Sequence, residues 1–111
     1  RRLTSTFRFE VNSSDFDARA LVDLERVTRY LLDNRVDGGA VRILGFADAQ
    51  GNPAHNLKLS LARAELVAKA LAQRGLTGTS VYGFGSEMPV ASNATEEGRR
   101  RNRRVEAWVG D

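Results

Sequence analysis

Segments with a strand pattern and segments with a helix pattern alternate along this chain of 111 residues. Four stretches carry apolar residues at every second position or in a short continuous run, which is the pattern of β-strands. They are LTSTFRFEV (3–11), AVRILGF (40–46), SVYGFG (80–85) and RVEAWV (104–109). Helical signals fill the three intervals, so the order is β-α-β-α-β-α-β. This order predicts an α/β two-layer sandwich, with the long helices packed on a mixed parallel and antiparallel sheet.

The two long helices are predicted from apolar residues that recur at helical spacing. The first ends near Asn34, and the second covers about residues 56–74, with Gly75 as the residue that ends it. A short third helix begins after Thr95, with two glutamates in its first turn, where they complement the helix dipole. The side chains expected to be buried are Ala20, Leu21, Leu24, Val27, Leu31 and Leu32 in the first helix, and Leu59, Ala62, Leu66, Val67, Ala70 and Leu71 in the second.

Composition excludes several classes of protein. The chain has no cysteine, which removes disulfide frameworks, thiol catalysis and cysteine-based zinc sites. His55 is the single histidine, so we expect it to be a solvated loop residue and we expect no metal site. Ser60 has no histidine partner at a recognisable spacing, and hydrolysis needs a nucleophile with a base, paired carboxylates or a metal. We therefore expect no catalysis and no cofactor.

The net charge is +3, and the positive charge is concentrated in GRRRNRR (98–104), which holds five of the 17 lysine and arginine residues. A run of this kind is able to contact nucleic acid through phosphate groups. The alternative is a solvated helix end, which we favour because no exposed aromatic residues are interleaved with the arginines. Nor does any stretch approach the roughly 18 apolar residues that a membrane-spanning helix needs, so we expect no membrane insertion by this domain.

The segment GFADAQGNPAHNLKLSLARA (45–64) places an acid on a loop and an arginine in the helix that follows. Asp48 comes just after a predicted strand, and Arg63 lies at the border of the apolar stripe. A surface ion pair between them is one interpretation, and exposed pairs contribute only about 0 to 1 kcal/mol. The other interpretation is a pocket for a ligand that carries both an ammonium and a carboxylate. In either case we expect both side chains to lie outside the core.

Two blocks of the sequence match a known pattern in register. Residues 45–64 are similar to G-H-T-D-x-x-G-x-x-x-x-N-x-x-L-S-x-x-R-A, and GFGSEMPVASNATEEGRRRNRRVE (83–106) is similar to G-x-G-x-x-x-P-x-x-x-N-x-T-x-x-G-R-x-x-N-R-R-V-E. Both patterns belong to the OmpA-like (OmpA/MotB/Pal) peptidoglycan-associated domain, and the resemblance extends over essentially the whole chain. It implies that residues 1–111 are a single OmpA-like domain from a longer, envelope-anchored protein, with a periplasmic location.

The resemblance also implies a function and a set of site residues. Domains of this family bind peptidoglycan without covalent chemistry, usually through meso-diaminopimelate in the stem peptide. Carried over by register, Asp48 accepts from the ligand's ammonium and Arg63 binds its carboxylate with two parallel N–H donors. The other positions that match the family's pocket are Asn56, Asn12 and Arg103, and backbone N–H groups near Ala47 and Asp48 are expected to complete the carboxylate's shell.

The chain departs from the family pattern just before Asp48, where Phe46-Ala47 replaces the usual His-Thr. Ala47 lacks the threonine hydroxyl, and Phe46 is either a wall of the pocket or a core residue, of which we favour the core. An OmpA-like fold that serves protein interaction or assembly, with weakened peptidoglycan binding, is therefore the alternative function. Two site residues also have structural interpretations, since Asn56 is placed to cap the second helix and Arg103 belongs to the basic run.

Overall fold

The computed structural model describes residues 2–8 and 18–109, with side chains described from Ala20 onward. The helices and strands follow the predicted order, with one short 3-10 turn before the second strand. They are β1 (Arg2–Arg8), α1 (Ala18–Asp33), η1 (Gly38–Ala40), β2 (Val41–Phe46), α2 (Pro53–Gln73), β3 (Ser80–Gly83), α3 (Glu96–Asn102) and β4 (Arg104–Val109).

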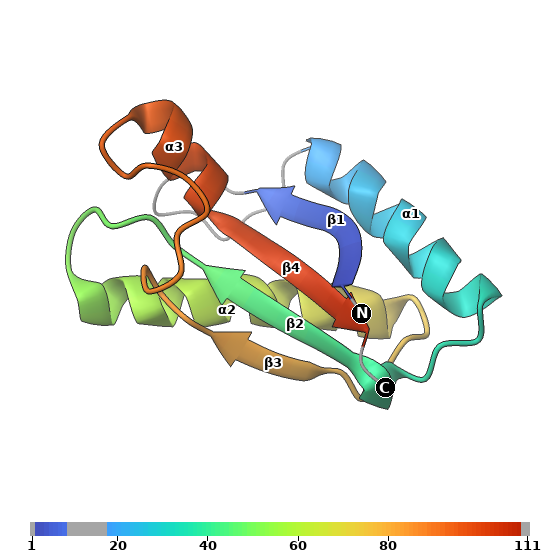
Figure 1. Cartoon of the computed structure of the whole chain (residues 1–111). Coiled ribbons are helices and arrows are strands. Elements are labelled where there is room, and N and C mark those ends of the chain that lie inside the picture. The colour runs from blue at the N-terminus through green and yellow to red at the C-terminus, as the bar shows by residue number, and fades with distance from the viewer. Residues whose placement is uncertain (1, 9–17, 110–111) are drawn as a thin grey trace.

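The four strands form one mixed sheet in the order β1-β4-β2-β3 (Figure 1). The last strand, β4, lies in the middle and pairs antiparallel with both β1 and β2, whereas β2 and β3 pair in parallel. The predicted fold class is therefore confirmed. Since β4 runs opposite to β2, the start of β4 lies beside the end of β2, and Phe46 is paired with Arg104.

The core lies between the sheet and the two long helices, which cover the same face of the sheet (Figure 1). On β4, Val105 and Ala107 point into this core, as the alternation of the strand predicts. The predicted helix residues that are buried there are Ala20, Leu24, Val27 and Leu31 of α1, and Val67, Ala70 and Leu71 of α2.

Several predicted core positions are wrong. Leu21 and Leu32 of α1 are 45% and 43% exposed, because the contact face of α1 is narrower than its apolar stripe. On α2, Ala62 is exposed, and Leu59 and Leu66 are only half-buried. The buried residues of the first half of α2 are instead polar, namely Asn56, Ser60 and Arg63. The apolar pattern located the helix but not the face that it buries.

Helix α2 begins three residues earlier than predicted, and its cap is Asn52. The Asn52 side chain accepts hydrogen bonds from the backbone N–H of Ala54 at 2.8 Å and of His55 at 3.2 Å. Pro53 occupies the first helical position, where a missing N–H has no cost. The interpretation of Asn56 as the helix cap is therefore wrong, and His55 lies in the first turn of the helix and not on a loop.

The first half of α2 lies very close to the sheet. A Cβ atom on Gly45 would lie 1.9 Å from the carbonyl oxygen of Ser60, so only glycine fits at this crossing. Ser60 is fully buried, and its hydroxyl donates to Leu57 O at 2.8 Å and accepts from Gly85 N at 2.9 Å. Ser60 thus joins α2 to the chain after β3, and this close packing fixes where the polar side chains of α2 lie.

Replacing Leu71 by alanine is expected to lower the free energy of unfolding by about 2 to 5 kcal/mol, because Leu71 is fully buried in the core. The matched control is Leu32→Ala, a leucine that the sequence pattern also places in the core but that is 43% exposed. This control is expected to change stability by about 0.5 kcal/mol or less. Chemical denaturation of both variants measures the difference, and equal losses would show that the assigned core is wrong.

Candidate ligand-binding site

The pairing of β2 with β4 brings two polar loops together at one end of the sheet. The chain leaves β2 at Phe46 opposite Arg104, where β4 begins. Asp48 lies two residues after β2, and Arg103 immediately precedes β4, so the two meet although they are 55 positions apart in the sequence.

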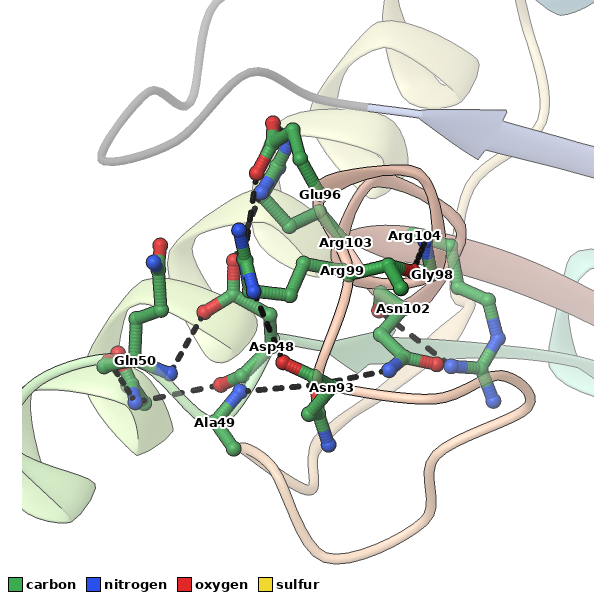
Figure 2. Close-up of polar contacts among 12 residues, drawn as sticks. Asp48, Ala49, Gln50, Asn93, Glu96, Gly98, Arg99, Asn102, Arg103 and Arg104 are labelled. Atoms are coloured by element: carbon green, nitrogen blue, oxygen red, sulfur yellow. Dashed lines mark hydrogen bonds and ion pairs between the residues drawn. The ribbon is translucent and has the colours of Figure 1, made fainter.

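Asp48 and Arg103 form a buried ion pair (Figure 2). Arg103 Nη1 donates to Asp48 Oδ2 at 2.8 Å, and the two side chains are 1% and 5% exposed. The other carboxylate oxygen, Oδ1, accepts from the backbone N–H of Gln50 at 2.9 Å. Burial acts to lower the pKa of Arg103, but its hydrogen bonds to Glu96 and Asp48 outweigh that effect and leave the pKa raised. Arg103 is therefore firmly charged.

The basic run is divided between buried and exposed positions, so its interpretation as a solvated helix end is wrong for its last two arginines. Arg103 and Arg104 are buried, whereas Arg100 and Arg101 are exposed. The guanidinium carbon of Arg104 lies 3.8 Å from the centre of the Phe46 ring, and its Nε donates to Glu106 at 2.7 Å. Arg104 therefore belongs to the fold, and Arg103 also lines the cavity described below.

Arg63 is fully buried, which contradicts the expectation that it lies at an exposed border of the helix. Its pKa is lowered to about 10, because burial removes the guanidinium from water and the positive charge of Arg103 repels it. The negative charge of Asp48 acts in the opposite direction but does not cancel these effects. Since Asp48 is also only 4% exposed, a surface ion pair between Asp48 and Arg63 is excluded.

Asn56 shapes the loop that carries Asp48. Its side-chain amide donates to the backbone carbonyls of Gln50 at 2.7 Å and of Asp48 at 3.3 Å. Asn56, Leu59 and Arg63 follow one another at spacings of three and four, so they share one face of α2. That face is turned toward the loop after β2.

These side chains line a cavity of about 410 Å³. The cavity brings together five of the six predicted site residues, while Asn12 lies outside the described residues. The lining residues are Ala47, Asp48, Gln50, Gly51, His55, Asn56, Leu59, Arg63 and Arg103. Sequence reasoning missed Gln50, Gly51, His55 and Leu59. The helical spacing of Leu59 from Asn56 and Arg63 is the signal that would have identified it as part of the wall.

The two departures from the family pattern have separate structural roles. Phe46 is 3% exposed and stacks on Phe84, with ring centres 5.4 Å apart, so the core interpretation of Phe46 is right. Ala47 lines the cavity, but its backbone N–H donates to Gly85 O at 2.7 Å. Of the N–H groups near Ala47 and Asp48 expected to complete a carboxylate's shell, that of Ala47 is thus engaged in the fold.

The residues that line the cavity carry more positive than negative charge. Two guanidinium groups, those of Arg63 and Arg103, lie close to one buried carboxylate, that of Asp48. This excess of positive charge among the lining residues makes the cavity suited to an anionic group. The described residues contain no group of three or more histidine, aspartate or glutamate side chains arranged to hold a metal ion.

The chain is similar to curated proteins of the bacterial cell envelope and wall. The sequence model of the OmpA family matches residues 8–103. The peptidoglycan-binding protein ArfA of Mycobacterium tuberculosis is 48% identical over 71 residues, which cover 62% of this chain and 22% of ArfA. Outer membrane protein A of Bordetella avium is 38% identical over 107 residues, which cover 85% of this chain and 55% of that protein. The chain therefore spans less than two thirds of these relatives.

The chain is also similar to solved structures. The peptidoglycan-associated lipoprotein of Burkholderia pseudomallei has a TM-score of 0.84 at 27% identity, covering 93% of this chain and 87% of that one. The C-terminal domain of MotB from Helicobacter pylori has a TM-score of 0.85 at 28% identity, covering 96% of this chain and 84% of that one. No helix in the described part of this chain is both long and apolar enough to cross a bilayer. With the family match extending over residues 8–103, the chain belongs to the OmpA family.

Proposed function

We propose that this domain is a non-catalytic peptidoglycan-binding module that anchors a cell-envelope protein to the cell wall, in the periplasm, by binding meso-diaminopimelate. The observation that carries the proposal is a cavity in which two buried arginines lie close to one buried aspartate. Membership of the OmpA family supports the substrate class, as does the peptidoglycan-binding relative. The side-chain end of diaminopimelate carries an ammonium and a carboxylate on one carbon, so it presents both charges to one site.

In this proposal the ligand's carboxylate binds Arg63. An anion there compensates the buried guanidinium, which burial and Arg103 otherwise disfavour. The ligand's ammonium binds Asp48, which has acceptor sites beyond those used by Arg103 and Gln50, because a carboxylate offers about four lone pairs. Arg103 then serves to hold Asp48, and Asn56 holds the loop.

A protein-interaction or assembly module is the second candidate function. It is favoured by the engaged N–H and missing hydroxyl at Ala47, which remove two donors that a bound carboxylate would use. Loss of two donors weakens a ligand site without changing the fold. Direct binding measurements distinguish the two functions, because an assembly module need not discriminate between cell-wall peptides.

The domain is expected to bind muropeptides with meso-diaminopimelate on the order of tenfold or more tightly than matched peptides with lysine. Lysine keeps the ammonium but lacks the carboxylate, so the guanidinium groups of the cavity would gain no contact with a ligand anion. Calorimetry with the two peptides measures the ratio, and sedimentation with purified sacculi, comparing wild type with Asp48→Ala, confirms the site. Equal affinity for the two peptides would contradict the zwitterion site and favour the assembly function.

Replacing Arg63 by methionine is expected to abolish sacculus binding while raising the free energy of unfolding of the ligand-free domain by about 1 to 3 kcal/mol. The pKa of Arg63 is lower in the folded chain than in the unfolded chain, so its charge costs stability at neutral pH, and this cost ends only above about pH 10. Methionine fills similar space without charge, and Asp48 keeps its pair with Arg103. A large loss of thermal stability in Arg63→Met would show instead that the arginine supports the fold.

The exposed part of the basic run is expected to play no part in binding. A double variant, Arg100→Ala with Arg101→Ala, should retain wild-type sacculus binding, because both side chains point to solvent. Retention of oligonucleotides by the wild type at physiological salt should be negligible, since Arg103 and Arg104 of the run are buried and do not present their charge to phosphates. Filter binding across a salt series tests this. Tight oligonucleotide binding that the double variant loses would establish a nucleic-acid function.

A further inference from the structure

Glu96 connects the exposed helix α3 to the buried ion pair of the cavity (Figure 2). Its Oε2 accepts from Arg103 Nη2 at 3.0 Å, while Arg103 Nη1 holds Asp48 at 2.8 Å. The side chain of Glu96 is 52% exposed and is absent from the wall of the cavity. It therefore acts on the cavity through Arg103, and any influence on a ligand is indirect.

The contact between Glu96 and Arg103 fixes the orientation of the Arg103 guanidinium. A guanidinium held at both terminal nitrogens by two carboxylates lies in a defined plane, because its donors form a rigid fork. Arg99 contributes on the other side, since its Nε donates to Glu96 Oε1 at 3.2 Å. Glu96 is thus held in place, and together with Asp48 it holds the terminal nitrogens of Arg103.

The same contact sets the charge of the site. Glu96 adds a carboxylate beside Arg103, although Arg99 contacts its other oxygen. Removing Glu96 therefore makes the surroundings of Arg63 and Arg103 more positive. A more positive site favours a ligand that carries only the carboxylate over one that also carries an ammonium.

We propose that Glu96 is a positioning residue that makes the cavity selective for zwitterionic side chains over purely anionic ones. This inference rests on the proposed function. In the family pattern that residues 83–106 resemble, any residue is allowed at the position of Glu96. The pattern alone therefore assigns no role to Glu96. From the sequence, Glu96 is interpreted only as a complement to the helix dipole, because nothing local indicates its contact with Arg103.

The chain offers a matched control in Glu97. This residue is also a glutamate in the first turn of α3 and is also exposed. Glu96→Gln and Glu97→Gln therefore remove the same charge from the same short helix, and glutamine keeps the length of the side chain and an acceptor oxygen. A difference between the two variants reports the contact with Arg103 and not the general charge of α3.

The test compares two probes by calorimetry at low salt: a muropeptide with meso-diaminopimelate, and the same peptide with the amine of the diaminopimelate side chain acetylated. The ratio of the two affinities is the readout, because the bulk of the acetyl group affects all variants alike. We expect Glu96→Gln to lower the preference for the zwitterion by about fivefold or more, whereas Glu97→Gln keeps the wild-type ratio. A ratio that is unchanged in Glu96→Gln, or changed equally in both variants, overturns the proposal.

A second measurement separates failure of this inference from failure of the proposed function. In the absence of ligand, NMR of the arginine side chains is expected to show slow rotation of the Arg103 guanidinium in wild type and Glu97→Gln, and faster rotation in Glu96→Gln. A wild type that binds neither probe overturns the selectivity and the proposed function together. Unchanged rotation in Glu96→Gln, with a wild type that binds, overturns the role of Glu96 alone.

Discussion

The site depends on the buried ion pair between Asp48 and Arg103. Asp48 lies on the loop after β2 and Arg103 lies directly before β4, at the end of the sheet where β2 and β4 meet. Breaking such a pair by removing one partner is costly, because the other charge then remains buried without compensation. Asn93 strengthens the same junction, since its side chain accepts from Ala49 N at 3.2 Å and from Asn102 Nδ2 at 2.8 Å (Figure 2). The pair and these amide contacts together fix the position of Asp48.

Helix α2 serves two purposes along its length. Its second half buries Val67 and Leu71 in the apolar core, while its first half buries Asn56, Ser60 and Arg63. Buried polar groups are tolerated only where hydrogen bonds or counter-charges satisfy them, and Asn56 and Ser60 meet this condition through backbone groups. The position of Arg63 is unfavourable for its positive charge, because burial removes the guanidinium from water and Arg103 repels it. A charge kept at a cost in stability is characteristic of a binding site.

The sequence predicted the order of the elements and the α/β class well, because strand alternation, helical spacing and caps such as Thr95 are local signals. Five of the six residues that the motif marks also line one cavity. The partner of Asp48 was not predictable in the same way. Arg63 is nearer in sequence, but the ion pair forms with Arg103, which reaches Asp48 only through the pairing of β2 with β4. Burial of Arg63 is likewise a non-local property that depends on how closely α2 packs on Gly45.

The unusual Phe46 has a place in this arrangement. Its ring stacks on Phe84 on one side and supports the guanidinium of Arg104 on another, a contact that attracts a cation to the face of an aromatic ring. Arg104 Nη2 also donates to Met88 O at 3.1 Å, which ties in the long loop before α3. Because Arg104 directly follows Arg103, fixing one restrains the backbone of the other. The aromatic residue that departs from the family pattern therefore supports the scaffold that holds Arg103 against Asp48.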